Sequence, residues 1–101
     1  MKVRFELTKE DIIKGQSDNN YPRSETCPMC QALNRQFGGH WAGYSHVFWD
    51  ESQNREIVTN DAIRIFVHSA DTIYNEPEIK DKTIGLIPIN CELEIKPRVN
   101  S

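Results

Sequence analysis

The sequence predicts an α+β domain in which helices cover one face of a small, mainly antiparallel sheet, in the order β-α-α-β-β-α-β. Three observations favour this fold class. Apolar and polar residues alternate over 1–7 and again over 89–96, as in strands with one buried face. Over 61–74, apolar residues instead recur at the three-and-four spacing of a helix that packs on a core.

Length, charge and cysteine content narrow the classes of function. The chain has 101 residues, which suit a single domain over 1–101. Its net charge of −3 comes from scattered residues with no cationic block, so direct binding to duplex DNA is not expected. No apolar run approaches the roughly 20 residues of a membrane-spanning helix. Three cysteines make a disulfide framework improbable and favour a reducing cytosol.

The first elements have clear boundary signals. Residues 1–7 form the first strand, and Thr8 with Asp11 resembles a capping arrangement for a short helix over Lys9–Lys14 that ends at Gly15. The polar residues Gln16–Thr26, which include Pro22, predict a loop.

A second helix begins at Cys27. Cys27 is expected to be the N-cap and Pro28 the first helical residue, because proline needs no partner for its missing N–H there. The apolar positions then recur every four residues until Gly38-Gly39 ends the helix: Met29, Leu33 and Phe37.

The second half of the chain predicts a hairpin, a long helix and a last strand. Residues Trp41–Trp49 are expected to form one strand, the polar turn Asp50–Asn54 follows, and Arg55–Val58 pairs back. Asn60 or Thr59 caps the helix that begins at Asp61. After a charged connection over Glu76–Lys82, the last strand follows Pro88 and ends at Pro97.

With this layout, the chain resembles a family of small proteins encoded mostly by bacteriophages and prophages. The resemblance spans nearly the whole chain and is carried by a Cys-Pro helix start, an Asp-Ile with a following Gly, and a Pro-led last strand. The matching residues are Asp11-Ile12, Gly15, Cys27-Pro28, Ala32-Leu33, Arg35, Phe66-Val67, Asp71, Pro88 and Glu92-Leu93. The resemblance implies a viral origin but no catalytic residue, because no activity is assigned to the family.

Cys27-Pro28-Met29-Cys30 is similar to the redox motif of glutaredoxins. A thiol at a helix N-terminus has a lowered pKa, which favours the reactive thiolate. The predicted fold lacks the parallel βαβ unit of glutaredoxins, and Ile87-Pro88 only imitates their proline. The preferred interpretation is that Cys27 is a structural cap and Cys30 a core residue, with thiol redox chemistry as the alternative.

Two other chemical sites use the same residues. A structural zinc ion would draw its ligands from Cys27, Cys30, Cys91 and the histidines His40, His46 and His68, but the second pair of ligands lacks the usual close spacing. A nucleophilic Cys27 would need His40 or His46 as its base. Neither site is preferred, so no metal and no cofactor are expected.

The aromatic hairpin is the preferred binding site. Five rings lie within nine residues, more than a thin ribbon can bury, and aromatic residues are common interface anchors. The competing interpretation is that most of them complete the core. The expected partner-binding residues are Trp41, Tyr44, His46, Phe48 and Trp49, with Arg35 as a cationic rim.

These features favour a non-enzymatic phage accessory protein that binds a host protein in the host cytoplasm. The most specific form of this hypothesis is an inhibitor of a bacterial defence complex, of the anti-CRISPR type, with a homodimer as a further option. The alternative is a sponge for nucleotide signals, in which rings stack on a base while Arg35, Arg23 or lysines hold phosphates. The third hypothesis is a thiol oxidoreductase that uses Cys27 and Cys30.

Overall fold

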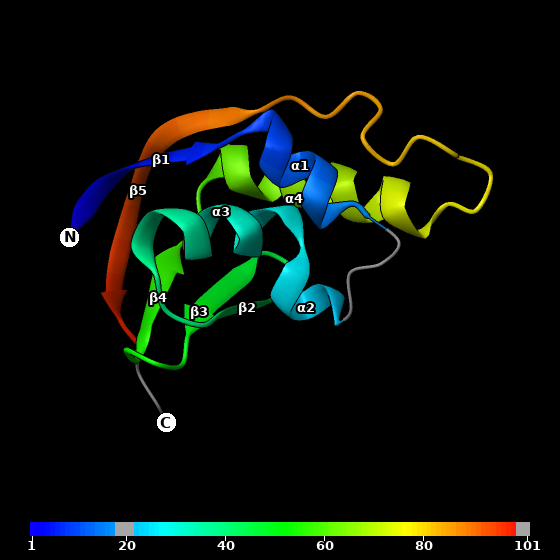
Figure 1. The fold of residues 1–101 in the computed structure, drawn as a ribbon. Coiled ribbons are helices and arrows are strands. Elements are labelled where there is room, and N and C mark those ends of the chain that lie inside the picture. Colours follow the sequence, from blue (N-terminus) through cyan, green and yellow to red (C-terminus); the bar gives the residue numbers. More distant parts are fainter. Residues whose placement is uncertain (18–21, 99–101) are drawn as a thin grey trace.

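The chain folds into one antiparallel sheet with four helices, as the sequence predicts. The computed structural model describes residues 1–17 and 22–98 (Figure 1). The elements are β1 (Lys2–Leu7), α1 (Lys9–Gly15), α2 (Arg23–Thr26), α3 (Pro28–Phe37), β2 (Trp41–Tyr44), β3 (Val47–Asp50), β4 (Arg55–Val58), α4 (Asp61–Asn75) and β5 (Ile89–Pro97).

The sheet joins the two ends of the chain. Its strand order is β1-β5-β4-β3-β2, so the last strand lies between the first strand and the hairpins. All neighbouring strands are antiparallel, with Phe5 opposite Cys91 and Ile57 opposite Ile95. Figure 1 shows β5 running beside β1 over most of its length.

One face of the sheet is buried under the helices, and the other is uncovered and polar along β1 and β5. Inward residues of β1 and β5, such as Phe5 and Leu93, are almost fully buried, whereas Arg4 and Glu92 oppose each other on the uncovered face. The core unites all five strands with three of the helices. Its buried members are Phe5, Leu7, Ile12, Met29, Cys30, Ala32, Leu33, Trp41, Phe48, Ile57, Ile63, Phe66, Val67, Ala70, Ile89, Leu93 and Ile95.

The prediction of a single strand over Trp41–Trp49 is wrong. The chain turns at Ser45, which adopts a left-handed φ of 56°, and β2 pairs with β3 so that Tyr44 lies opposite Val47. The turn has a physical reason. Trp41 and Phe48 are seven residues apart and would point to opposite faces of a straight strand, whereas the turn places both in the core.

The predicted loop Gln16–Thr26 contains a short helix. Residues 23–26 form α2, and the Thr26 hydroxyl donates to the Pro22 carbonyl at 2.9 Å. The part of the predicted loop over 18–21 lies outside the described residues. The long connection between α4 and β5 has neither helix nor strand, as predicted, and the side chain of Gln16 donates to the Lys82 carbonyl within it.

Asp50 is the last residue of β3 and anchors the turn that follows it. Its side chain is fully buried and accepts hydrogen bonds from the His40 N–H at 2.8 Å, the Ser52 hydroxyl at 2.7 Å and Arg55 Nε at 2.9 Å. Burial alone would raise the pKa of Asp50, but these donors lower it to about 2. The polar turn expected over Asp50–Asn54 therefore begins with a buried structural carboxylate.

Candidate functional site

The expected aromatic binding site is divided between the core and the surface. Trp41 and Phe48 are each only 1% exposed. The indole N–H of Trp41 donates to the Gly38 carbonyl at 2.8 Å, and the guanidinium of Arg55 lies over its ring. These two rings hold the hairpin on the core and present no accessible surface to a partner.

The other hairpin residues are more accessible. Tyr44 is 80% exposed and lies opposite Val47, while Trp49 and His46 are half-buried. The Trp49 ring lies under the guanidinium of Arg98. Tyr44, Val47 and Trp49 alternate with the buried hairpin residues, which directs them to the uncovered face of the sheet. Tyr44, at the hairpin tip, also lines a cavity between the hairpin and the helices.

The two arginines expected to hold phosphates are both engaged in the fold. Arg35 donates to the buried carboxylate of Asp11 at 2.7 Å and to the Glu6 carbonyl at 2.8 Å. Arg23 donates to Asp71 at 3.0 Å and to Gln16 at 2.7 Å. These contacts leave little of the Arg23 guanidinium for a nucleotide, while the Arg35 side chain remains 46% exposed beside Asp11.

Cys27 and Cys30 form a thiol pair at the N-terminus of α3. Cys27 is the N-cap, with extended backbone angles, and Pro28 is the first helical residue, as predicted. Cys27 is half-buried, whereas Cys30 is fully buried and donates its thiol hydrogen toward the Ser24 carbonyl at 3.4 Å. The two sulfurs differ in access, because only Cys27 lines a cavity.

The position of this helix start is fixed by a close contact with α1. Gly15 is buried against Pro28, and a Cβ atom on Gly15 would lie 2.1 Å from the Pro28 nitrogen. Only glycine fits at this contact. Ion pairing between Asp11 on α1 and Arg35 on α3 holds the same two helices together further along.

The environment of the thiols separates their pKa values. When Cys27 is ionised, the Cys30 thiol can turn its hydrogen from the Ser24 carbonyl to the Cys27 sulfur, and this hydrogen bond lowers the pKa of Cys27 against the opposing effect of burial. The backbone N–H groups of Cys30 and Met29 and the charge of Arg23 lower it further. The same hydrogen bond, together with burial, raises the pKa of Cys30. Cys27 is thus the more readily ionised thiol of the pair.

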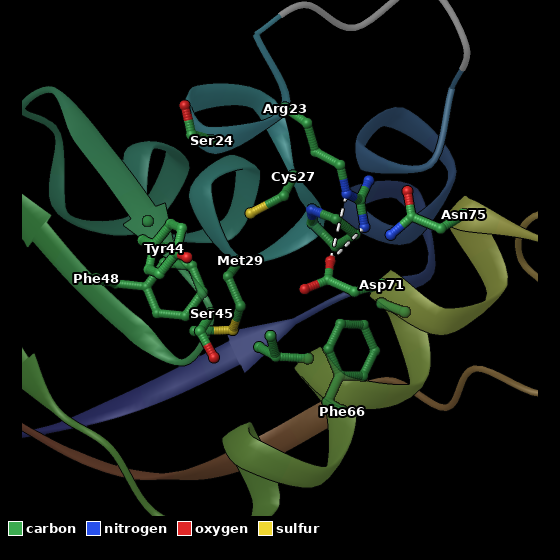
Figure 2. Close-up of a pocket in the computed structure, with 14 residues that line it drawn as sticks. Arg23, Ser24, Cys27, Met29, Tyr44, Ser45, Phe48, Phe66, Asp71 and Asn75 are labelled. Atoms are coloured by element: carbon green, nitrogen blue, oxygen red, sulfur yellow. Dashed lines mark hydrogen bonds and ion pairs between the residues drawn. The ribbon is translucent and has the colours of Figure 1, made fainter.

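Cys27 opens into a cavity of about 280 Å³ between α2, α3, α4 and the tip of the β2–β3 hairpin. Figure 2 shows its sulfur turned into this space, away from the joined side chains of Arg23 and Asp71. The walls near the sulfur are mainly apolar. They include Met29, Phe48, Phe66, Val67 and Ala70.

The contacts of the histidines and of Cys91 do not support a histidine base for Cys27 or a zinc site. His40 binds Glu25 at 2.5 Å, and His46 lies beside Ser45, so neither histidine is placed as a base for Cys27. Cys91 is on β5, where Asn60 donates to it at 3.7 Å. Within residues 1–17 and 22–98, no group of three or more His, Cys, Asp or Glu side chains is arranged to hold a metal ion.

The sequence pattern identified the thiols but not the walls around them. Phe66, Val67 and Ala70 belong to the apolar stripe of α4, which predicts core packing and gives no signal for a cavity. Ser45 and Gly43 reach the cavity only because the hairpin turns where it does.

No family model, no curated protein and no solved structure matches this chain. Across the described part of the chain, none of the helices has the length and apolar character needed to cross a membrane.

Proposed function

We propose that this protein is a thiol–disulfide oxidoreductase in which Cys27 is the attacking thiolate and Cys30 the resolving thiol. The observation that carries the proposal is the placement of Cys27, the N-cap residue of α3, whose sulfur faces the cavity with a buried second thiol three residues further along. We prefer this function to the partner-binding hypothesis because the cavity gives a small substrate access to Cys27. The sheet is antiparallel throughout, so the proposal uses the geometry of the thiols and no likeness to the glutaredoxin fold.

The reaction is a pair of thiol–disulfide exchanges. The Cys27 thiolate attacks one sulfur of a disulfide R–S–S–R, forms a mixed disulfide with it and releases RS⁻. Cys30 then attacks the Cys27 sulfur, the second RS⁻ leaves, and a Cys27–Cys30 disulfide remains. The Cys30 proton passes to the leaving thiolate. The substrate gains two electrons, and two molecules of a low-molecular-weight thiol return the protein to the dithiol form.

The environment of the pair suits these roles. The N–H groups at the start of α3 stabilise a thiolate on Cys27, and burial keeps Cys30 protonated until the mixed disulfide has formed. Residues three apart at a helix start are also close enough for their side chains to meet.

The test is turnover of bis(2-hydroxyethyl) disulfide with a thiol reductant. We expect turnover by the native protein and by Cys91→Ser, which removes the cysteine outside the pair. Cys27→Ser abolishes turnover. Without the reductant, Cys30→Ser should stop at a mixed disulfide that mass spectrometry detects on Cys27, whereas the native protein should proceed to the Cys27–Cys30 disulfide. Equal rates for the native protein and Cys27→Ser would overturn the proposal.

A second candidate function is the binding of a host protein, in line with the phage resemblance. It is favoured by the accessible apolar side chains on the uncovered sheet face, where Tyr44, Val47 and Val58 are 80%, 44% and 38% exposed. Tyr44→Ala with Trp49→Ala should abolish capture of a defence complex from bacterial lysate without unfolding the domain. Unchanged capture would exclude this face as the binding site. If the face instead binds a second copy of the protein, sedimentation would show a dimer.

A further inference from the structure

A second cavity adjoins the one that contains Cys27. It has a volume of about 270 Å³ and lies between the hairpin turn and α4. The two cavities share four lining residues: Ser45, Val67, Asp71 and Asn75. They are therefore neighbouring compartments along one side of α4, and a ligand attached at Cys27 can extend from the first toward the second.

The two compartments differ in chemistry. The first is mainly apolar, whereas the second is lined by Arg64, His46 and His68 with the polar side chains of Thr72 and Asn75. The only acidic residue common to both linings is Asp71, and its charge is balanced by Arg23 at 3.0 Å. The second compartment thus presents cationic and hydrogen-bonding groups to whatever enters it.

Arg64 is the accessible cation of this compartment. Its side chain is 55% exposed and pairs with Asp61 at 3.0 Å, and the Asp61 side chain is itself 90% exposed. Surface pairs of this kind contribute little and exchange partners readily. Arg23 differs, since its side chain is 20% exposed and bonded to Asp71, Gln16 and the Gly15 carbonyl.

Arg64 lies beyond the part of α4 that borders the Cys27 compartment. It lines only the second compartment, whereas Val67 and Asp71, about one and two turns further along the helix, line both. The guanidinium therefore belongs to the part of the cleft that Cys27 does not line.

We propose that the disulfide reduced at Cys27 is a small anionic molecule whose carboxylate or phosphate binds Arg64, in the compartment that His46 and His68 also line. This inference rests on the oxidoreductase function proposed above and names its substrate class. The apolar walls around Cys27 receive the carbon chain next to the sulfur. The anion meets Arg64 at the far end of the cleft.

The test compares two probes of nearly equal size, 4,4′-dithiodibutyric acid and its dimethyl ester, which has no carboxylate. The reduced protein is mixed with each probe, and the rate of mixed-disulfide formation on Cys27 is measured by quenched alkylation and mass spectrometry. We expect the acid to react about fivefold faster than the ester, because losing a surface charge contact is worth up to about 1 kcal/mol. Arg64→Gln should remove this difference and leave the ester rate unchanged.

Arg4→Gln is the matched control. It makes the same change in net charge on β1, which is at the opposite edge of the sheet from β2 and so far from the hairpin turn that borders the compartment. This variant should preserve the preference for the acid. A preference that persists in Arg64→Gln, or an ester that reacts as fast as the acid, would overturn the substrate class while leaving the oxidoreductase in place. If neither probe reacts faster with the native protein than with Cys27→Ser, the proposed function itself fails.

Discussion

Arg23 Nη2 lies 3.0 Å from Asp71 Oδ1 and joins the short helix α2 to α4. The same guanidinium donates to Gln16 and to the Gly15 carbonyl and lies 3.9 Å from the centre of the Tyr74 ring. One side chain thus holds α2 against both α1 and α4. Because α2 leads directly into Cys27, this network also fixes the charge of Arg23 beside the thiol pair.

Replacing Arg23 by glutamine should raise the pKa of Cys27. The substitution removes a positive charge that favours the thiolate, and it should also lower the free energy of unfolding by about 1–3 kcal/mol through lost charge-assisted hydrogen bonds. The pH dependence of Cys27 alkylation measures the first effect and urea unfolding the second. Arg4→Gln, with the same charge change, should alter neither; an equal shift in both variants would refute the local role of Arg23.

Cys30→Ala should move the alkylation profile of Cys27 to higher pH. The Cys30 thiol is the largest contributor to the lowered pKa of Cys27, and alanine cannot donate a hydrogen bond. Cys30→Ser retains a hydroxyl donor and should give the smaller shift. Cys91→Ala, on β5, serves as the control and should leave the profile in place. Identical profiles for Cys30→Ala and the native protein would contradict the assigned hydrogen bond.

Asp50→Asn should destabilise the domain at neutral pH. Asparagine removes the charge that Arg55 faces in a buried site, and breaking such a pair costs about 3 kcal/mol. Urea unfolding measures the loss. Asp61→Asn is the control, because the Asp61 side chain is 90% exposed and its pairing should contribute little.

The contribution of Asp50 to the free energy of unfolding should also depend on pH. Its pKa is about 2 in the folded protein and about 3.9 in an unfolded chain. A lowered carboxyl pKa stabilises the fold above the unfolded value, and this contribution is lost as the pH falls through the folded value. The stability difference between the native protein and Asp50→Asn should therefore narrow between about pH 4 and pH 2. A constant difference over that range would show that the charge of Asp50 is not the stabilising feature.

Gly15→Ala should force the start of α3 away from α1. The added Cβ would lie 2.1 Å from the Pro28 nitrogen, a backbone atom that cannot move aside alone. We expect a loss of several kcal/mol or failure to fold, because overpacking of a buried contact displaces the backbone. Lys14→Ala changes the neighbouring exposed position and should be tolerated. Normal stability of Gly15→Ala in thermal unfolding would contradict the contact.

The sequence predicted those elements that have local signals. Thr8 accepts from the Asp11 N–H and Asn60 from the Ile63 N–H, so the predicted caps of α1 and α4 are confirmed, with Asn60 as the cap of α4. Cys27 and Pro28 begin α3 as predicted. Each of these features depends on residues within four positions along the chain, where spacing alone defines the geometry.

Features that depend on distant contacts were not predictable. The turn at Ser45 lacks the glycine or asparagine that marks most tight hairpins, and its position follows instead from the burial of both Trp41 and Phe48 in the core. The cavity has the same origin, since its walls come from α2, α3, α4 and the hairpin. Some residues that carry the phage resemblance also meet only in the fold: Asp11 with Arg35, and Gly15 with Pro28.

The most direct test of the account is the identity of the disulfide that forms when the reduced protein meets an excess of bis(2-hydroxyethyl) disulfide. We expect the intact mass to fall by two hydrogens and peptide mapping to place the bond between Cys27 and Cys30, with Cys91 still open to alkylation. A protein in which Cys27 and Cys30 both remain free, or in which the bond involves Cys91, would contradict this expectation.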